Sequence, residues 1–591
     1  MAATIRLRAD GRLLVCLDKD ILRGGLDLAQ KKLGPDRVKH MPAELVDPTF
    51  LKNEDALIAC VKGTEAAKNV SRLLKVRIPP LPASGYWIRP VTRGGGSVLI
   101  VAGGDRFGAL AGLSEAIRWS EFAPPCFIYS GGERKETPAF PLRFYWTWDH
   151  STNWVLDDPG NQVNGCSNPY LKKPETFLED YRRLIDHAVD MRFNAVVVCG
   201  FFRDSHGAEA FAYDISRYGA DRGVAVLPGV GITAYSGIYY EGEHPANLET
   251  FLRRNPDRGG RTKDGKPAGG LTPYRADNVQ YIQRSIEWVA KAFPVGGIYL
   301  ENGDYQVDYS RAAVRARKRI PTEEEDFLKD QYAAYRPALE VYDRLDPDAW
   351  NIYATYCGFD MNNPDSLQRG LGRAEPYFAR HMPRSAIAMW TLSGMLRKMP
   401  VALRDWMDDR TPAALYDNPT WPRGLRPPTP RSAGFMHQGS QWSAVPRNAF
   451  ALSSFAEGCL RAWESGLEGI SIHGEVSSRT MTWLLNYLAV RHWTYHPRST
   501  LKEFALAELA PRLGGEQAAM DFIEALCLVE EGSIAEAREI TRKHIGSSYS
   551  WRAPKQTLDA LERVRMWMEM RWWACHPDSA VRMLPRISDV L

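Results

Sequence analysis

Residues 297–304 read GIYLENGD, a short apolar run that ends in an acid, an amide and a second acid. The run is strand-sized and lies between glycines, which favours a buried β-strand. The same order of apolar run, polar cluster and amphipathic helical stretch recurs through the central part of the chain. We therefore predict parallel strands that are joined by helices.

Eight strands are predicted in this region, at residues 143–148, 195–201, 224–229, 297–300, 351–356, 386–390, 433–437 and 469–473. Helical periodicity lies between them, for example in residues 177–191, 279–292 and 450–465. Eight such units over roughly 350 residues predict an α/β fold, a (β/α)8 TIM barrel with long loops after its strands. A doubly wound sheet is the alternative, but it usually has fewer units and a recognisable nucleotide loop.

We predict three domains in the 591 residues. Residues 1–137 form a small α/β domain with strands at 4–7, 13–16 and 56–61 and helices at 21–33 and 66–74. Residues 138–498 form the barrel, and residues 499–591 form a helical domain with a Trp- and Met-rich stripe at 566–573. Such a stripe is more typical of a packed core or interface than of a binding site.

Residues 94–113 read GGGSVLIVAGGDRFGALAGL, which predicts a buried strand, a glycine turn and the start of a helix. The turn lacks the G-x-G-x-x-G fingerprint and the Lys-Ser/Thr pair of a P-loop. We interpret it as a tight turn that packs against a neighbour, and not as a nucleotide site.

The composition excludes several classes of partner. The 75 Lys and Arg nearly balance the 71 Asp and Glu, and no basic tail is present, which argues against nucleic acid. The longest apolar runs are strand-sized, so no membrane span is predicted. Residues 1–14 lack the apolar region of a signal peptide, which predicts a cytoplasmic protein, although a periplasmic or secreted chain whose leader had been removed would read the same.

The nine scattered cysteines show no C-x-x-C spacing, so we predict free thiols.

Barrel enzymes place their catalytic groups at the C-terminal ends of the strands. In this chain those positions carry carboxylates, aromatic rings and neutral polar groups, a mixture that suits a sugar: rings cover its C–H face, and acids and amides bind its hydroxyls. We predict a carbohydrate substrate and no cofactor, and a homo-oligomer is compatible with the sequence. The predicted substrate-binding residues are Trp148, Asp149, His150, Arg203, Asp204, His206, Tyr235, Asp304, Tyr356, Asp360, Trp390, His437, Gln438, Trp442 and His473.

Glu301 and Glu475 are the predicted catalytic pair, because they follow the fourth and eighth strands. Glycosidic hydrolysis needs one carboxyl group to protonate the leaving oxygen and another to act as base or nucleophile. We predict that Glu301 is the acid, since neighbouring Tyr299 and Tyr305 would partly desolvate it. The alternative for either residue is that the carboxylate caps the next helix.

Two further functions remain open at this point. The chain is also compatible with a barrel that binds carbohydrate without cleaving it. The histidines at the predicted mouth offer a third possibility, a metal-dependent lyase or deacetylase. However, no H-x-H or H-E-x-x-H spacing occurs, and no G-x-S-x-G elbow supports a serine hydrolase.

Two segments resemble known glycosidases. Residues 98–119, VLIVAGGDRFGALAGLSEAIRW, resemble the end of the non-catalytic N-terminal domain of bacterial α-glucuronidases and β-hexosaminidases, and residues 141–148, PLRFYWTW, are similar to their first barrel strand. The predicted domain order is also similar to that of α-N-acetylglucosaminidases. The resemblance implies an exo-acting O-glycosyl hydrolase of carbohydrate metabolism or polysaccharide degradation, and it points to no single family.

The chain departs from these enzymes at two strand ends. Substrate-assisted hexosaminidases carry Asp-Glu or Asp-Asp after strand four, where this chain has Glu301 and Asn302. Many retaining barrel glycosidases carry a glutamate nucleophile after strand seven, where this chain has His437 and Gln438. An acid after strand four and Glu475 after strand eight are compatible with inversion, which needs carboxyl groups about 6.5–9.5 Å apart.

Overall fold

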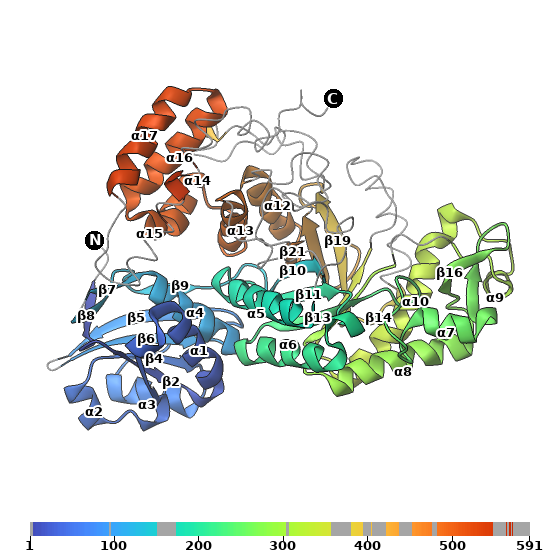
Figure 1. Cartoon of the computed structure of the whole chain (residues 1–591), viewed down its shortest axis with the longest axis horizontal. Coiled ribbons are helices and arrows are strands. Elements are labelled where there is room, and N and C mark those ends of the chain that lie inside the picture. The colour runs from blue at the N-terminus through green and yellow to red at the C-terminus, as the bar shows by residue number, and fades with distance from the viewer. Residues whose placement is uncertain are drawn as a thin grey trace.

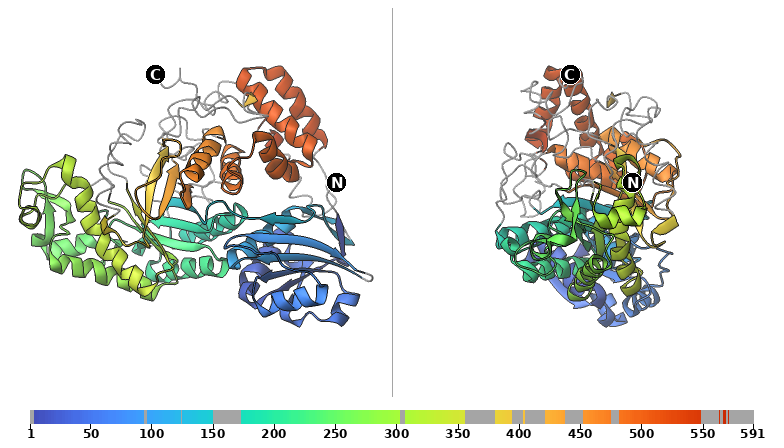
Figure 2. Two further views of the ribbon diagram at one scale, coloured as in Figure 1. Left: turned by 180° about the vertical axis from the view of Figure 1, so that it is seen from behind. Right: turned by 90° about the vertical axis from the view of Figure 1, so that its right-hand side faces the viewer.

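The computed structural model describes residues 4–93, 96–123, 125–149, 173–302, 307–355, 380–393, 403–404, 421–436, 452–474, 481–547, 563, 566–568 and 570. A closed barrel lies at the centre of the molecule, with an N-terminal α/β unit at one end and a lobe that contains helices α7 to α10 at the other (Figure 1). Helices near the C-terminus cover a third side, as Figure 2 shows from behind.

The N-terminal unit contains two sheets. Its strands are β1 (Ile5–Arg8), β2 (Leu13–Leu17), β3 (Val38–Pro42), β4 (Ala56–Val61), β5 (Tyr86–Thr92), β6 (Ser97–Gly103), β7 (Ser120–Ala123), β8 (Cys126–Tyr129) and β9 (Arg134–Glu136). The larger sheet has the order β3-β2-β4-β6-β5-β9, and β1-β8-β7 form the smaller one. The accompanying helices are α1 (Leu22–Leu33), α2 (Pro48–Asn53), α3 (Glu65–Leu74) and α4 (Arg106–Arg118).

The glycine turn between β6 and α4 is packed against its neighbours, as the sequence predicted. A Cβ on Gly104 would lie 1.9 Å from the carbonyl oxygen of Pro82, so only glycine fits there. Asp105 caps α4 by accepting a hydrogen bond from the backbone N–H of Gly108 at 2.7 Å, and it also accepts one from the N–H of Ser84. The turn therefore joins strand and helix and presents no phosphate cradle.

The eight predicted central strands all form, and they close into one parallel barrel. They are β10 (Leu142–Trp148), β11 (Ala195–Cys199), β13 (Ala225–Val230), β17 (Gly297–Leu300), β18 (Trp350–Ala354), β19 (Ile387–Ser393), β20 (Ser432–Met436) and β21 (Gly469–His473). The ring closes where β10 pairs with β21, with Trp146 opposite His473. The fold class predicted from the sequence is therefore confirmed.

Helices surround the barrel and form the lobe beside it. They are α5 (Pro174–Asp190), α6 (Ala208–Arg222), α7 (Leu248–Arg254), α8 (Ala276–Ala292), α9 (Arg311–Arg317), α10 (Glu323–Leu345), α12 (Leu452–Glu464) and α13 (Met481–Trp493). Short strands β12 (Phe202–Arg203), β14 (Tyr239–Glu241), β15 (Gly259–Arg261) and β16 (Pro267–Leu271) lie in the loops after β11 and β13. Helix α5 shows why these segments pack on the barrel: its buried residues recur at helical spacing, from Phe177 to Ala188.

Alternation along the barrel strands separates two cores. Side chains that point outward join the large core between the strands and their helices. Those that point inward form a separate cluster, which consists of Leu142, Phe144, Trp146, Ala195, Val197, Cys199, Leu227, Tyr299, Ile352, Ala354, Ile387, Met389, Ala433 and Phe435. Any residue that continues this inward face past the end of a strand reaches the barrel mouth.

The C-terminal segment is helical where the structure describes it. Its helices are α14 (Leu501–Phe504), α15 (Ala510–Leu513), α16 (Glu516–Glu531) and α17 (Ile534–Ser547), and a π-helical turn at Ala505–Leu509 separates the first two. Pro511 follows this turn, as expected for a residue that cannot donate its backbone N–H within a helix. Trp567 stacks on His544 with ring centroids 4.3 Å apart, which supports a packing role for this part of the stripe.

A buried charge network joins the three regions of the chain. Arg491 of α13 binds both Glu115 of α4 and Glu508 of the π-helical turn, and all three side chains are 2% exposed or less. Arg118 and Arg192 add further cations to Glu115. These arginines hold the pKa of Glu115 well below its ordinary value, although burial alone would raise it.

Removal of Arg491 should therefore destabilise the whole molecule. We expect Arg491→Met to lower the free energy of unfolding by about 3–5 kcal/mol, because two buried carboxylates lose a shared cation. Arg183→Met is the matched control, since its ion pair with Glu179 is about half exposed and such pairs contribute under about 1 kcal/mol. Urea unfolding measures both variants, and equal losses would contradict this role for the network.

Candidate active site

Glu301 lies at the mouth of the barrel, directly after β17. Its backbone N–H donates to the carbonyl of Val230 at 3.0 Å, which extends the pairing of β13 and β17 by one residue. The buried Tyr299, two positions earlier on the inward face, donates its hydroxyl to Oε2 of Glu301 at 2.5 Å. The carboxyl group is therefore held by the strand beneath it.

The neighbouring amide faces a different direction. The side chain of Asn302 donates to Oγ1 of Thr233 at 3.0 Å and so ties the end of β17 to the loop after β13. Its backbone N–H donates to the hydroxyl of Tyr335 at 2.7 Å. The next described helix, α9, is capped by Ser310, so the structure does not use Glu301 as a cap there.

A row of aromatic rings crosses the mouth from strand eight toward strand three. His473, at the end of β21, meets Trp146 edge-on at 5.2 Å between ring centroids, and Trp146 meets Trp148 at 6.1 Å. Trp148 in turn contacts Tyr235 and Tyr240 edge-on, each at 6.0 Å. The row joins three predicted site residues, Trp148, Tyr235 and His473, through the ring of Trp146.

Two features of this row indicate a site rather than an ordinary core. Tyr235 and Ser236 are consecutive non-glycine residues with positive φ angles, 45° and 62°, a strained arrangement that clusters at functional loops. The indole Nε1 of Trp146 is buried, and within the described residues it has no hydrogen-bond partner. A buried donor without a partner costs about 1–3 kcal/mol, so its retention calls for a reason.

Asp149 supports the site from beside the mouth. Its fully buried carboxylate lies 2.5 Å from Nε of Arg203 and 3.6 Å from Nε2 of His206. A Cβ on Gly200, which has a φ of 78°, would lie 2.6 Å from the same carboxylate. Arg203 also lies 3.6 Å from Glu241, so acids flank this guanidinium on both sides.

Tyr240 is a site residue that the sequence prediction missed. It belongs to the short strand β14 in the long loop after β13, and its ring lies 5.2 Å from the guanidinium of Arg203. Burial raises the pKa of Tyr240 well above its ordinary value, and the nearby Cys199, Asp149 and Glu301 contribute to the rise. The only signal in the sequence is the aromatic pair at 239–240, which carries no motif.

Three predicted substrate contacts need correction. Trp390 points outward, where its indole N–H donates to Ser432 and its ring lies 6.3 Å from that of Trp421. His206 is fully buried and stacks on Phe177 at 3.9 Å, so it supports Asp149 and does not face a ligand. Asp149 itself has no exposed surface, and its role is to hold Arg203.

Asp204 and Arg203 are adjacent in sequence, but each has a different partner. Asp204 accepts a hydrogen bond from the hydroxyl of Tyr239 at 2.6 Å on the outer loop, while Arg203 pairs with Asp149.

Several predictions lie outside the described residues, namely the catalytic Glu475 and the substrate-binding His150, Asp304, Tyr356, Asp360, His437, Gln438 and Trp442. They stay predictions.

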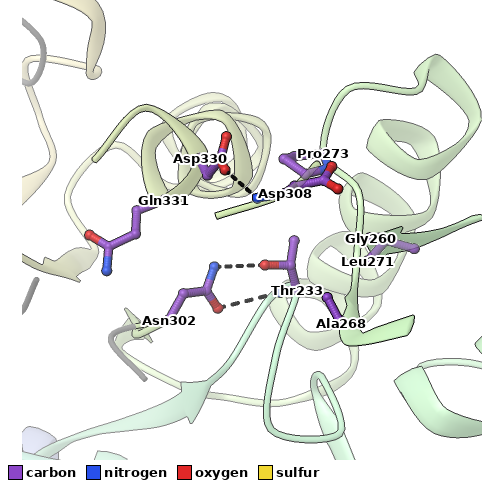
Figure 3. Close-up of a pocket in the computed structure, with 10 residues that line it drawn as sticks. Thr233, Gly260, Ala268, Leu271, Pro273, Asn302, Asp308, Asp330 and Gln331 are labelled. Carbon is purple, nitrogen blue, oxygen red and sulfur yellow. Dashed lines mark hydrogen bonds between the residues drawn. The ribbon is translucent and has the colours of Figure 1, made fainter. Parts of the chain in front are cut away.

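A small polar pocket lies beside Asn302, between the loop after β13, the β15–β16 hairpin and α10 (Figure 3). Its empty volume is about 430 Å³, including its open mouth. The carboxylate of Asp308 accepts hydrogen bonds from Arg261 and Ser310, and Asp330 accepts from the N–H of Asp308 and pairs with Arg317. The described residues that line the pocket include no aromatic ring, which distinguishes it from the aromatic mouth.

Other predictions concern absences. Within the described residues no group of three or more His, Cys, Asp and Glu side chains is arranged to hold a metal ion. Among the described residues no disulfide joins any of the six cysteines, and one of them, Cys199, lies in the barrel interior. None of the described helices combines the length and the apolar character that crossing a membrane requires.

Comparison with solved structures shows the same fold in glycoside hydrolases. A family GH115 4-O-methyl-α-glucuronidase with specificity for decorated arabinogalactans superposes with a TM-score of 0.55 at 11% identity, over 98% of this chain and 72% of that one. A β-N-acetylhexosaminidase from Bacteroides fragilis gives 0.49 at 13% identity, over 84% and 89%. The family GH20 β-N-acetylhexosaminidase from Streptomyces coelicolor gives 0.46 at 13% identity, over 88% and 94%. No family model matches the chain, and a search of curated proteins found no match.

The ion pair beside the mouth gives a test of its supporting role. We expect Arg203→Gln to cost about 3–5 kcal/mol in unfolding free energy, because Asp149 stays enclosed without its cation. Adding Asp149→Asn to that variant should recover part of the loss. Arg217→Gln, which breaks a half-exposed pair with Asp221, is the control in urea unfolding. A loss in Arg203→Gln no larger than in the control would refute the assignment.

Proposed function

We propose that this protein is a glycoside hydrolase, exo-acting, in which Glu301 is the general acid and Glu475 is the second carboxylate. The observation that carries the proposal is the position of Glu301: an acid on the inward face of a closed barrel, held by Tyr299, next to a row of aromatic rings. Carboxyl groups and aromatic faces are what a barrel needs to bind and cleave a sugar.

The reaction follows from the two acids. Glu301 donates its proton to the glycosidic oxygen as the bond to the anomeric carbon breaks, which lets the leaving group depart as a neutral alcohol. On the opposite face of the sugar, the second carboxylate either activates a water that attacks the anomeric carbon or attacks that carbon itself. In the second case water, activated by the ionised Glu301, then hydrolyses the glycosyl ester and restores both carboxyl groups. Glu475 is proposed from its place in the sequence, two positions after His473 and at the end of the strand four places from β17 in the ring of eight.

The surroundings of Glu301 support a carbohydrate as the substrate. The faces of Trp148 and Tyr240 offer stacking surfaces for the C–H face of a pyranose. The indole N–H of Trp146, which finds no acceptor in the described part of the chain, is a donor that a sugar oxygen would satisfy. The fold shared with glycosidases agrees with this proposal by analogy, because fold alone does not determine activity.

We further propose domain boundaries at residues 137 and 498, with the barrel between them as the catalytic domain. Exo action is proposed because the sequence has long segments after the barrel strands, which would close the mouth into a pocket together with the C-terminal helices. One end of the glycan chain would then enter the pocket, and the enzyme would release one terminal sugar in each turnover.

Substitution of the acid tests the proposal directly. Glu301→Gln should reduce the turnover of the best substrate from a panel of aryl glycosides by roughly 10²–10⁴-fold, because a glutamine of the same shape cannot deliver the proton. Binding of the released sugar, measured by calorimetry, should persist and show that the site is intact. Glu287→Gln, on the exposed side of α8, is the matched control and should leave turnover unchanged.

Two outcomes would overturn this assignment. Full activity of Glu301→Gln would remove Glu301 from the chemistry. Sugar binding by the wild-type chain without hydrolysis of any glycoside in the panel would favour the non-catalytic carbohydrate-binding barrel. Glu475→Gln tests the second carboxylate in the same assay, with a loss of similar size expected.

A further inference from the structure

Among the described contacts of Glu301, the hydrogen bond from Tyr299 is the one that bears on how the acid is held. Tyr299 lies on β17 two positions before Glu301, has no exposed surface, and belongs to the inward-facing cluster of the barrel. Its hydroxyl donates to Oε2 of Glu301 at 2.5 Å. A hydroxyl has one proton to donate, so in this geometry that proton is committed to the carboxyl group.

We propose that Tyr299 is the positioning residue for Glu301: its hydroxyl holds Oε2 so that the proton for the glycosidic oxygen is carried on Oε1. The proposal rests on the function proposed above. It assigns to Tyr299 no contact with the substrate, because the phenol lies beneath the mouth within the barrel. This hydrogen bond from a rigid strand would help to fix the rotamer of the acid and to select the oxygen that carries the proton.

The surroundings of Tyr299 keep it a donor. Burial raises the pKa of its phenol well above the ordinary value, and Glu301, Cys199 and Tyr335 raise it further. The phenol therefore stays protonated at every pH at which an enzyme works. Its outward neighbour along β17, Leu300, joins the outer core, so the strand cannot rotate to release the contact without losing that packing.

The bond has a predictable effect on the pH profile. A hydrogen bond donated to a carboxylate favours the ionised form over the acid form. A general acid must be protonated, so activity falls at high pH as Glu301 ionises. Removal of the Tyr299 hydroxyl should make Glu301 keep its proton to higher pH, which moves the alkaline limb of the profile upward.

Other charged groups at the mouth must be kept constant in this comparison. The titratable and charged groups near the Tyr299–Glu301 pair come from five places in the fold, and they are Cys199 of β11, Tyr335 of α10, Asp149 after β10, Arg203 of β12 and Tyr240 of β14. Tyr299→Phe alters none of these groups. Any shift in the limb therefore reports the lost hydroxyl.

The experiment compares Tyr299→Phe with the loss of a second buried tyrosine hydroxyl, one that contacts β17 from α10. Tyr342 of α10 donates to the carbonyl of Gly297 at 3.4 Å and is equally buried, so Tyr342→Phe is the matched control. We expect Tyr299→Phe to lower kcat roughly tenfold with little change in KM, since the acid loses its orientation. Its alkaline limb should move up by roughly 0.5–1 pH unit, whereas that of Tyr342→Phe should not move.

A second readout needs no turnover. Infrared difference titration of the carboxyl C=O stretch, with Glu301→Gln as the blank, follows the protonation of Glu301 in folded wild-type and Tyr299→Phe protein. An upward shift of this titration in Tyr299→Phe supports the positioning role. An unmoved or lowered titration overturns it, whatever the rate. Full activity of Glu301→Gln would instead refute the proposed function, and the infrared titration would then report only on the hydrogen bond between Tyr299 and Glu301.

Discussion

The site depends on the closure of the barrel, in which β10 pairs with β21 and brings Trp146 opposite His473. Closure removes both sheet edges and forces alternate side chains of every strand either inward or outward. Because Glu301 follows β17 two positions after the inward-facing Tyr299, the alternation that buries Tyr299 also directs the acid toward the mouth. The orientation of Glu301 on which the proposed chemistry depends thus follows from the alternation of side chains along the strand.

Support for the mouth comes from groups that are themselves enclosed. The Asp149 and Arg203 pair lies between acids and rings, with His206 and Gly200 packed against the carboxylate. Farther away, Arg491 joins the N-terminal unit, the barrel helix α13 and the C-terminal helices through buried carboxylates. Breaking such a pair leaves an uncompensated charge, so these contacts limit movement of the elements that carry the site.

Much of the fold could be predicted from the sequence, because strand length and alternation are local signals. All eight barrel strands were located within a few residues, and β17 and β21 match their predicted ranges. By contrast, β5 was missed, since Pro90 interrupts a run that otherwise suits a strand. The π-helical turn at Ala505–Leu509 was also missed, because the sequence of this segment is typical of a continuous helix. The contact between Glu508 and Arg491 is visible only in the structure.

The site was harder to predict, since the sequence shows which residues follow a strand but not which way each one faces. Glu301 and Asn302 are neighbours, yet one faces the mouth and the other binds Thr233. Trp390 was expected at a strand end, but β19 continues to Ser393, and Trp390 points outward because side chains alternate along the strand and its neighbour Met389 points inward. Tyr240 comes from a long loop, where no periodicity exists to reveal it.

The most direct test of the central claim, that Glu301 delivers a proton to the leaving oxygen, is the dependence of Glu301→Gln on the leaving group. A glycosyl fluoride needs no proton to release fluoride, whereas an alkyl glycoside does. The account predicts that Glu301→Gln retains substantial turnover of the fluoride and loses that of the alkyl glycoside. Equal losses on both substrates would contradict it.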